Sequence, residues 1–267
     1  MNTISEFLPY PFIQRALIAS IMIGILCPFV GNFVVLRRMS FFSDAISHAA
    51  FAGIAAGAVL GMDLSISSLI FAILIAILIA FLSEKTTLSH DTVIGVAFSG
   101  AIATGMLIIG MMKRYRGDIF TFLFGDILAI TTMDLMLIFL FSLLTITLLL
   151  VFLKPLLYIT FNRDLAQIEG INVRLFEYLL FMMIAVVITV SLKIMGIILV
   201  TSLLIVPAAS AKNLASNMKS LFVLSCIFGV ASGVLGLMAS IYLNTSSGPT
   251  IVLVSIGIFF MTMFKKK

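Results

Sequence analysis

Residues 65–82 read SISSLIFAILIAILIAFL and contain no charged side chain. An apolar run of about 18 residues without charges is typical of a helix that crosses a lipid bilayer. The whole chain has the same character, because 62% of its 267 residues are hydrophobic and only 10% are charged. Soluble domains are about half apolar and about a quarter charged. The sequence therefore predicts an all-α, polytopic membrane protein.

The hydropathy pattern predicts about nine membrane spans in one transmembrane domain, residues 1–267, with eight spans as an alternative if the first segment lies along the interface. The expected spans are about 13–35, 45–61, 65–82, 93–112, 133–153, 175–192, 194–209, 220–242 and 250–264. The connections are too short for a folded extramembrane domain, which needs more than about 50 residues. Neither a Gly-x-x-x-x-Gly-Lys phosphate loop nor any Gly-Lys pair occurs in the chain. Any ATP that drives this protein is therefore expected to be hydrolysed by a partner.

The net charge of +5 reports orientation in the membrane and not nucleic-acid binding. If the C-terminal lysines face the cytoplasm, nine spans place the N-terminus outside. The inside positions then include Arg37, Arg38, Lys85, Lys154, Arg163, Arg174, Lys212, Lys219 and Lys265–Lys267, against Arg15, Lys113, Arg114, Arg116 and Lys193 outside. No removable signal peptide is expected over Met1–Gln14, which lacks a basic segment before the first apolar run. Cys27 and Cys226 lie in separate apolar spans and are expected to be packing residues.

Three spans carry small residues on one helical face, which lets helix backbones approach closely in lipid. The second span has the longest row, and the fourth and eighth have shorter ones. The rows are Ala45, Ala49, Gly53, Gly57 and Gly61, then Gly95, Ser99 and Ala103, then Gly229 and Gly233. This pattern predicts tight helix packing and says nothing about function.

Asp44 and His48 form the sharpest candidate site. They are four residues apart, so on a helix they share one face, with the small residues Ala52 and Ala56 leaving open space beyond them. A carboxylate and an imidazole are half of a site for zinc or manganese, and two ligands suit an ion that must also be released. Neutral imidazole is the ligand form, so we expect transport to weaken as the pH falls through about 6.5. The alternative is a helix start in which Ser43 is the N-cap and His48 bonds Asp44.

Other acidic residues lie near the ends of the fourth and fifth spans. Asp91 is expected to cap the fourth span, with Ser89 and Thr92 beside it and His90 in an exposed connection. Asp126 and Asp134 flank the fifth span, as solvated boundary residues or as attractors of an entering cation.

Pro207 is expected to break the seventh span near its inner end. A short helix over 208–218 would then lie at the cytoplasmic surface and dock onto a partner. An ordinary turn between helices is the alternative.

Four ordered segments resemble the membrane-spanning permease subunits of ABC-type zinc and manganese importers. They are Val35–Ala49, Asp91–Gly95, Gly196–Ala211 and Ser247–Leu253. The resemblance implies an ABC importer permease fold in a bacterial inner membrane. It also implies a homodimer, a separate ATP-binding subunit and an extracytoplasmic metal-binding protein.

The same resemblance implies roles for individual residues. Asp44 and His48 fall on the family's Asp-x-x-x-His positions, which are expected to contact the transported zinc or manganese. Pro207, Ala208, Ala209, Ser210, Ala211 and Lys212 fall on the stretch expected to form the ATPase-coupling loop. No permanently bound cofactor and no enzymatic activity of the chain itself are expected.

Three other functions are weighed against this one. An ABC permease for a metal chelate would share the coupling arrangement and need a wider cavity, and an assembly subunit would show no metal phenotype when Asp44 is changed. A secondary carrier coupled to protons or sodium usually buries several acids. Here the acids other than Asp44 are expected at boundaries or in loops, among them Asp63, Glu84, Asp118, Asp126, Asp134, Asp164, Glu169 and Glu177. This placement argues against coupling to an ion gradient.

Overall fold

The protein is helical throughout the part of the chain that the structure describes. The computed structural model describes residues 9–111, 125 and 127–264, and these contain no strand. The elements are α1 (Pro11–Leu36), α2 (Phe41–Leu60), α3 (Leu64–Lys85), α4 (His90–Met111), η2 (Ile127–Ala129), α6 (Thr132–Val151), α7 (Leu153–Phe161), α8 (Arg163–Ile168), α9 (Val173–Leu214), α10 (Met218–Leu243) and α11 (Ser247–Phe264). Within the described ranges, eight helices are long and apolar enough to cross a membrane. The predicted polytopic helical fold is confirmed.

Helix α9 accounts for the difference between nine predicted spans and eight helices. It covers 42 residues and includes the two spans predicted over 175–192 and 194–209. Its only non-helical residue is Gly196, with φ 74° and ψ 170°. The kink divides α9 into segments of about 35 Å and about 27 Å at 1.5 Å per residue, each close to the thickness of a bilayer core. The described residues therefore contain nine segments of spanning length in eight helices.

The predicted break at Pro207 is wrong. Helix α9 continues through Pro207 to Leu214. Ala208, Ser210 and Ala211 are fully buried in this helix, and within residues 207–212 only Lys212 is exposed. A proline removes one backbone hydrogen bond but leaves its neighbours free to stay helical, and such prolines are tolerated in membrane helices. The predicted coupling loop is thus a packed helical segment, and its contact with an ATPase stays a prediction.

The chain divides into two compact units that are interleaved in the sequence. The first comprises residues 1–35, 124–143 and 191–267, and the second comprises residues 36–123 and 144–190. Each unit is described by itself below. The single domain predicted over residues 1–267 stays a prediction.

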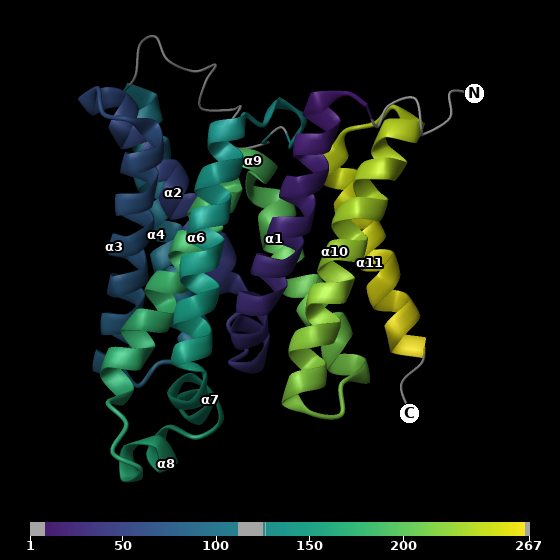
Figure 1. Ribbon diagram of the computed structural model, residues 1–267. Coiled ribbons are helices and arrows are strands. Elements are labelled where there is room, and N and C mark those ends of the chain that lie inside the picture. The colour runs from purple at the N-terminus through teal and green to yellow at the C-terminus, as the bar shows by residue number, and fades with distance from the viewer. Residues whose placement is uncertain (1–8, 112–124, 126, 265–267) are drawn as a thin grey trace. The chain divides into compact units, whose positions relative to one another are not determined.

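The second unit is built around α2, which packs against both α3 and α4 (Figure 1). The small residues of α2 make the contact with α3 close. A Cβ atom on Gly53 would lie 2.7 Å from Phe71 Cβ and 2.7 Å from the Ser67 carbonyl oxygen, and the Ser67 hydroxyl donates to the Gly53 carbonyl. Gly61 ends α2 in the left-handed conformation with φ 68°. The predicted small-residue row on α2 is therefore a packing surface.

The first unit packs α1 against α10 through glycines on both helices. A Cβ on Gly24 would lie 2.9 Å from the Gly229 carbonyl oxygen, and one on Gly233 would lie 3.1 Å from that of Ser20. Helices α10 and α11 form an antiparallel hairpin (Figure 1). Cys27 and Cys226 are free, and the Cys27 thiol lies 3.7 Å from the Ser191 hydroxyl. The prediction that both cysteines are packing residues and not a disulfide is confirmed.

The predicted small-residue row on α4 behaves differently. Gly95, Ser99 and Ala103 are exposed, and a Cβ on Gly95 would meet no atom within 4 Å. The buried side of α4 instead contains Ala97, Ala101 and Gly105. Within the described residues of one chain, Gly95, Ser99 and Ala103 therefore do not form a packing surface.

Candidate metal site and the polar network beside it

Asp44 and His48 lie on the first two turns of α2. The helix begins at Phe41, so Ser43 is inside it and its hydroxyl donates to the Ser40 carbonyl oxygen at 3.0 Å. Ser43 is therefore not the N-cap, which corrects the alternative interpretation of this stretch. Asp44 belongs to the first turn, where the positive end of the helix dipole favours a carboxylate.

The two side chains lie one helical turn apart on the same face of α2, and both have intermediate exposure. Within the described residues, no group of three or more His, Cys, Asp or Glu side chains lies close enough to hold a metal ion. The pair thus supplies two donors, and any further ligand must come from outside this set of side chains.

The face of α2 beyond the pair is filled, contrary to the predicted open space. Ala52 and Ala56 are buried, and Gly105 of α4 packs against Ala52. This close approach places the Phe98 ring of α4 edge-on to the His48 ring, with 5.1 Å between the ring centroids. The aromatic contact limits the orientations that the imidazole can take.

The His90–Asp91 cluster differs from its prediction. Helix α4 begins at His90, and the Ser89 hydroxyl accepts from the Thr92 amide at 3.3 Å, so Ser89 caps the helix and Asp91 lies in its first turn. His90 is half-buried, and its Nδ1 lies 3.3 Å from the Ser83 hydroxyl.

Asp134 is engaged and does not offer a free charge to an entering cation. Its Oδ1 accepts from Lys193 Nζ at 2.9 Å, and its Oδ2 accepts from the Thr131 hydroxyl at 2.6 Å. Asp134 is therefore a boundary residue in the first turn of α6, as expected, and its ion pair with Lys193 argues against a role as a cation attractor. Asp118, Asp126, Lys113, Arg114, Arg116 and the terminal lysines lie outside the described residues.

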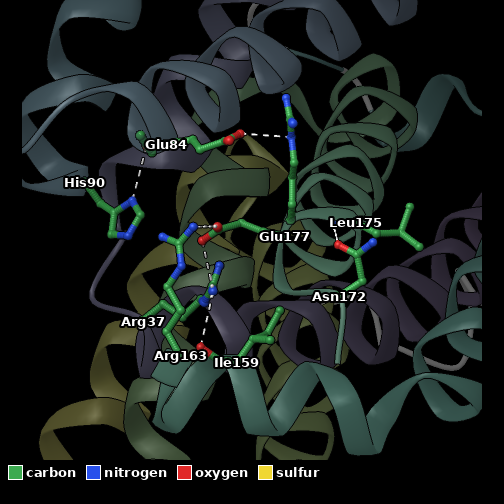
Figure 2. A network of polar contacts seen from close by, with 10 residues as sticks. Arg37, Glu84, His90, Ile159, Arg163, Asn172, Leu175 and Glu177 are labelled. Carbon is green, nitrogen blue, oxygen red and sulfur yellow. Dashed lines mark hydrogen bonds and ion pairs between the residues drawn. The ribbon is translucent and has the colours of Figure 1, made fainter. Parts of the chain in front are cut away.

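A buried ionic network that was not predicted from the sequence lies in the second unit (Figure 2). Glu177 of α9, expected at a boundary, is only 4% exposed. It forms ion pairs with Arg37 at 3.2 Å and with Arg163 at 3.3 Å. Arg174 pairs with Glu84 at 3.0 Å beside it. No local sequence pattern indicates this network, because Arg37 and Glu177 are 140 positions apart.

Basic side chains gather at one end of the second unit. They follow α1, end α3, or lie on α7, α8 and the start of α9, and are Arg37, Arg38, Lys85, Lys154, Arg163 and Arg174. The described part of the opposite end, between α2 and α3, holds Asp63 and no basic residue. The positive-inside rule predicts that this basic end faces the cytoplasm.

These features define a class of protein before any comparison: a multi-pass helical membrane protein with an acid–imidazole pair on a membrane helix and a basic cytoplasmic end. The ABC 3 transport family matches residues 9–266. The chain belongs to this family.

Characterised relatives match along almost the whole chain. The manganese transport system membrane protein MntC of Listeria innocua is 37% identical over 98% of this chain and 93% of its own length. The high-affinity zinc uptake system membrane protein ZnuB of Haemophilus influenzae is 33% identical over 94% of this chain and 97% of its own. Among solved structures, PsaBC from Streptococcus pneumoniae matches with a TM-score of 0.86 and 36% identity, covering 98% of this chain and 96% of that one.

A metal-chelate type ABC transporter, solved in an inward-facing conformation, matches with a TM-score of 0.77 at 17% identity. It covers 94% of this chain and 85% of the other. This second likeness shows the shared fold alone.

Proposed function

We propose that this chain is the membrane permease subunit of an ATP-driven ABC importer that moves a divalent metal ion, manganese or zinc, into the cytoplasm of a bacterium. The observation that carries the proposal is the near full-length match to a manganese and a zinc permease at 37% and 33% identity. Relatives for both metals match about equally well, so the choice of metal is assigned to the protein that delivers it. The affinity series also favours zinc over manganese at almost any nitrogen and oxygen site.

The permease itself does not hydrolyse ATP in this proposal. Its sequence has no phosphate loop and no connection long enough for a nucleotide-binding domain. A separate ATP-binding subunit supplies the energy, and an extracytoplasmic metal-binding protein delivers the ion to the outer end.

Asp44 and His48 are proposed as a transient binding site for the ion. Ionisable groups on membrane helices are costly and therefore point to function. A carboxylate oxygen and an imidazole nitrogen suit both metals, and a site of only two donors holds an ion weakly enough to release it.

A homodimer is proposed to complete the pathway. The exposed row Gly95, Ser99 and Ala103 on α4 has no partner helix among the described residues of one chain. Small residues on a membrane helix allow a second helix to approach closely. Phe98 on the same helix contacts His48, so a second copy packed against α4 would lie next to the proposed transient binding site.

The ATP-binding subunit is proposed to contact α7 and α8 rather than residues 207–212. These short helices lie at the basic end of the second unit, and Phe161, Leu165 and Ile168 are 61%, 52% and 81% exposed there. Exposed apolar side chains on a segment outside the membrane indicate a protein contact.

The test is metal uptake by proteoliposomes that contain the permease with its ATP-binding subunit, supplied with the metal-loaded extracytoplasmic binding protein. Ala substitution of Asp44 or His48 is expected to reduce manganese or zinc uptake at least about tenfold, since even indirect partners of a metal ligand are worth about 10–100-fold. Asp91→Asn is the matched control, because Asp91 is also in the first turn of a membrane helix but is exposed. It should transport normally.

Three results would contradict parts of the proposal. Wild-type uptake rates in both Ala variants would contradict the proposed transient binding site at Asp44 and His48. Uptake that proceeds without the ATP-binding subunit would favour a secondary carrier. Uptake of a metal chelate but not of the free ion would favour a chelate permease.

A further inference from the structure

The buried carboxylate of Glu177 connects separate pieces of the second unit. Its Oε1 accepts from Arg37 Nη2 at 3.2 Å, and its Oε2 pairs with Arg163 Nη2 at 3.3 Å (Figure 2). Arg37 lies in the turn between α1 and α2, Arg163 is the first residue of α8, and Glu177 itself is on α9. One side chain therefore links α8, α9 and the α1–α2 turn.

Arg37 extends the link to α7. The same Nη2 atom that bonds Glu177 also donates to the Ile159 carbonyl oxygen at 3.4 Å. Ile159 is buried in the last part of α7. The guanidinium of Arg37 thus holds α7, and the carboxylate of Glu177 holds α8.

The link is strong because its central pair is removed from water. The side chains of Arg37 and Glu177 are 8% and 5% exposed. Burial lowers the pKa of Arg37, and the charge of Glu177 opposes that effect. Breaking a buried pair by removing one partner leaves an uncompensated charge, which is far more costly than losing a surface pair. The pair of Arg174 and Glu84 is different, because Arg174 is 62% exposed.

We infer that Glu177 is a positioning residue that holds α7 and α8 rigidly to α9 and to the α1–α2 turn, so that a movement imposed on α7 and α8 by the ATP-binding subunit reaches the membrane helices. This inference rests on the proposed function. Without the carboxylate, α7 and α8 would move with the ATP-binding subunit while α9 stayed behind. ATP hydrolysis would then continue with little metal import.

The experiment measures metal ions imported per ATP hydrolysed, in proteoliposomes that contain the permease and its ATP-binding subunit and are supplied with the metal-loaded extracytoplasmic binding protein. Glu177→Gln keeps the shape of the side chain and removes its charge, and we expect this ratio to fall at least about tenfold. Glu84→Gln is the matched control, since it breaks the neighbouring exposed pair that joins α3 to α9 and leaves α7 and α8 attached. Its ratio should equal that of the wild type.

The ratio separates positioning from a structural role. A variant that merely folds less well loses import and hydrolysis in proportion, so its ratio is unchanged, and that result in Glu177→Gln overturns the inference. If Glu177→Gln does not fold, Arg163→Gln decides, because Arg163 is 41% exposed and its loss leaves the Arg37 pair intact. An unchanged ratio in Arg163→Gln then overturns the inference.

Two further outcomes complete the design. The double variant Glu177→Gln with Arg163→Gln should be no worse than Glu177→Gln alone, because Arg163 acts through its pair with Glu177, which the first substitution already removes, and additive losses contradict this mechanism. Failure of the wild-type complex to import metal with ATP would overturn the proposed function itself, which is a result distinct from an unchanged ratio in a working importer.

Discussion

Gly53 and Gly95 are glycines on neighbouring helices, in rows of small residues with the same spacing, yet their surroundings differ. An added methyl group on Gly53 would lie 2.9 Å from Ser68 Cα and 2.7 Å from the Ser67 carbonyl oxygen, whereas one on Gly95 would touch nothing within 4 Å. Backbone atoms of α3 cannot rotate away as a flexible side chain can. Gly53 is therefore packed against another helix of the same chain, whereas Gly95 is not.

We predict that Gly53→Ala destabilises the permease by about 1–3 kcal/mol through overpacking of α2 against α3. Gly100→Ala on α4 is the control, because no atom lies within 4 Å of its added methyl group and it is not in the row proposed to meet a second copy. It should be neutral, or stabilising by up to about 1 kcal/mol, because alanine favours a helix more than glycine does. Thermal unfolding of the detergent-solubilised protein measures both effects. Equal melting temperatures for the two variants would contradict the close α2–α3 contact.

At the scale of elements, α9 bends at a glycine and not at the proline that it contains. Pro207 stays helical, while Gly196 adopts φ 74° and ψ 170°, a region that is open essentially only to glycine. Gly125, at φ 61°, packs directly against the backbone of Met195 and Gly196, where a side chain would collide. The bend is thus built from two glycines in contact.

Gly196→Ala is therefore expected to cost about 1–3 kcal/mol, because a Cβ atom strains this backbone conformation. Gly257→Ala in α11 is the matched control, since no atom lies within 4 Å of its added methyl group and it belongs to the same unit. The fraction of monodisperse protein after heating, measured by size-exclusion chromatography, reports the difference. A Gly196→Ala protein as stable as the control would show that the kink is not required.

The helices α7 and α8 carry the second prediction at this scale. Ile168→Asp should abolish co-purification of the ATP-binding subunit, because Ile168 is 81% exposed and a carboxylate cannot be buried in an apolar contact without cost. Lys212→Ala tests the rival contact at residues 207–212, where Lys212 is the exposed member, and should leave co-purification unchanged. The reverse outcome would move the contact to the end of α9.

Over the whole molecule, the arrangement of charge sets the orientation in the membrane. Six basic side chains lie at one end of the second unit, whereas the turn between α2 and α3 holds Asp63. Because basic residues are retained in the cytoplasm, α3 is expected to run from the outer surface to the inner one.

Cysteine labelling in intact cells tests this orientation, after Cys27 and Cys226 are replaced by serine. Met62→Cys, at the exposed turn before α3, should react with a membrane-impermeant maleimide added outside. Leu88→Cys, at the exposed turn after α3, should react only after the membrane is permeabilised. The opposite labelling pattern would invert the topology and reverse the proposed direction of transport.

The amino-acid sequence by itself determined the membrane class, the helical content, the nine segments of spanning length and the acid–imidazole pair on α2. These features depend on local composition and on spacing within one helix, which the bilayer thickness and the helical period translate directly into structure. Only the tertiary structure decided which small-residue row is packed, that α9 bends at Gly196 and not at Pro207, and that Asp134 is paired with Lys193. It also decided that Glu177 lies buried between two arginines, one of them 140 positions away. Contacts of this kind arise when distant segments pack together, and no local pattern specifies the partner.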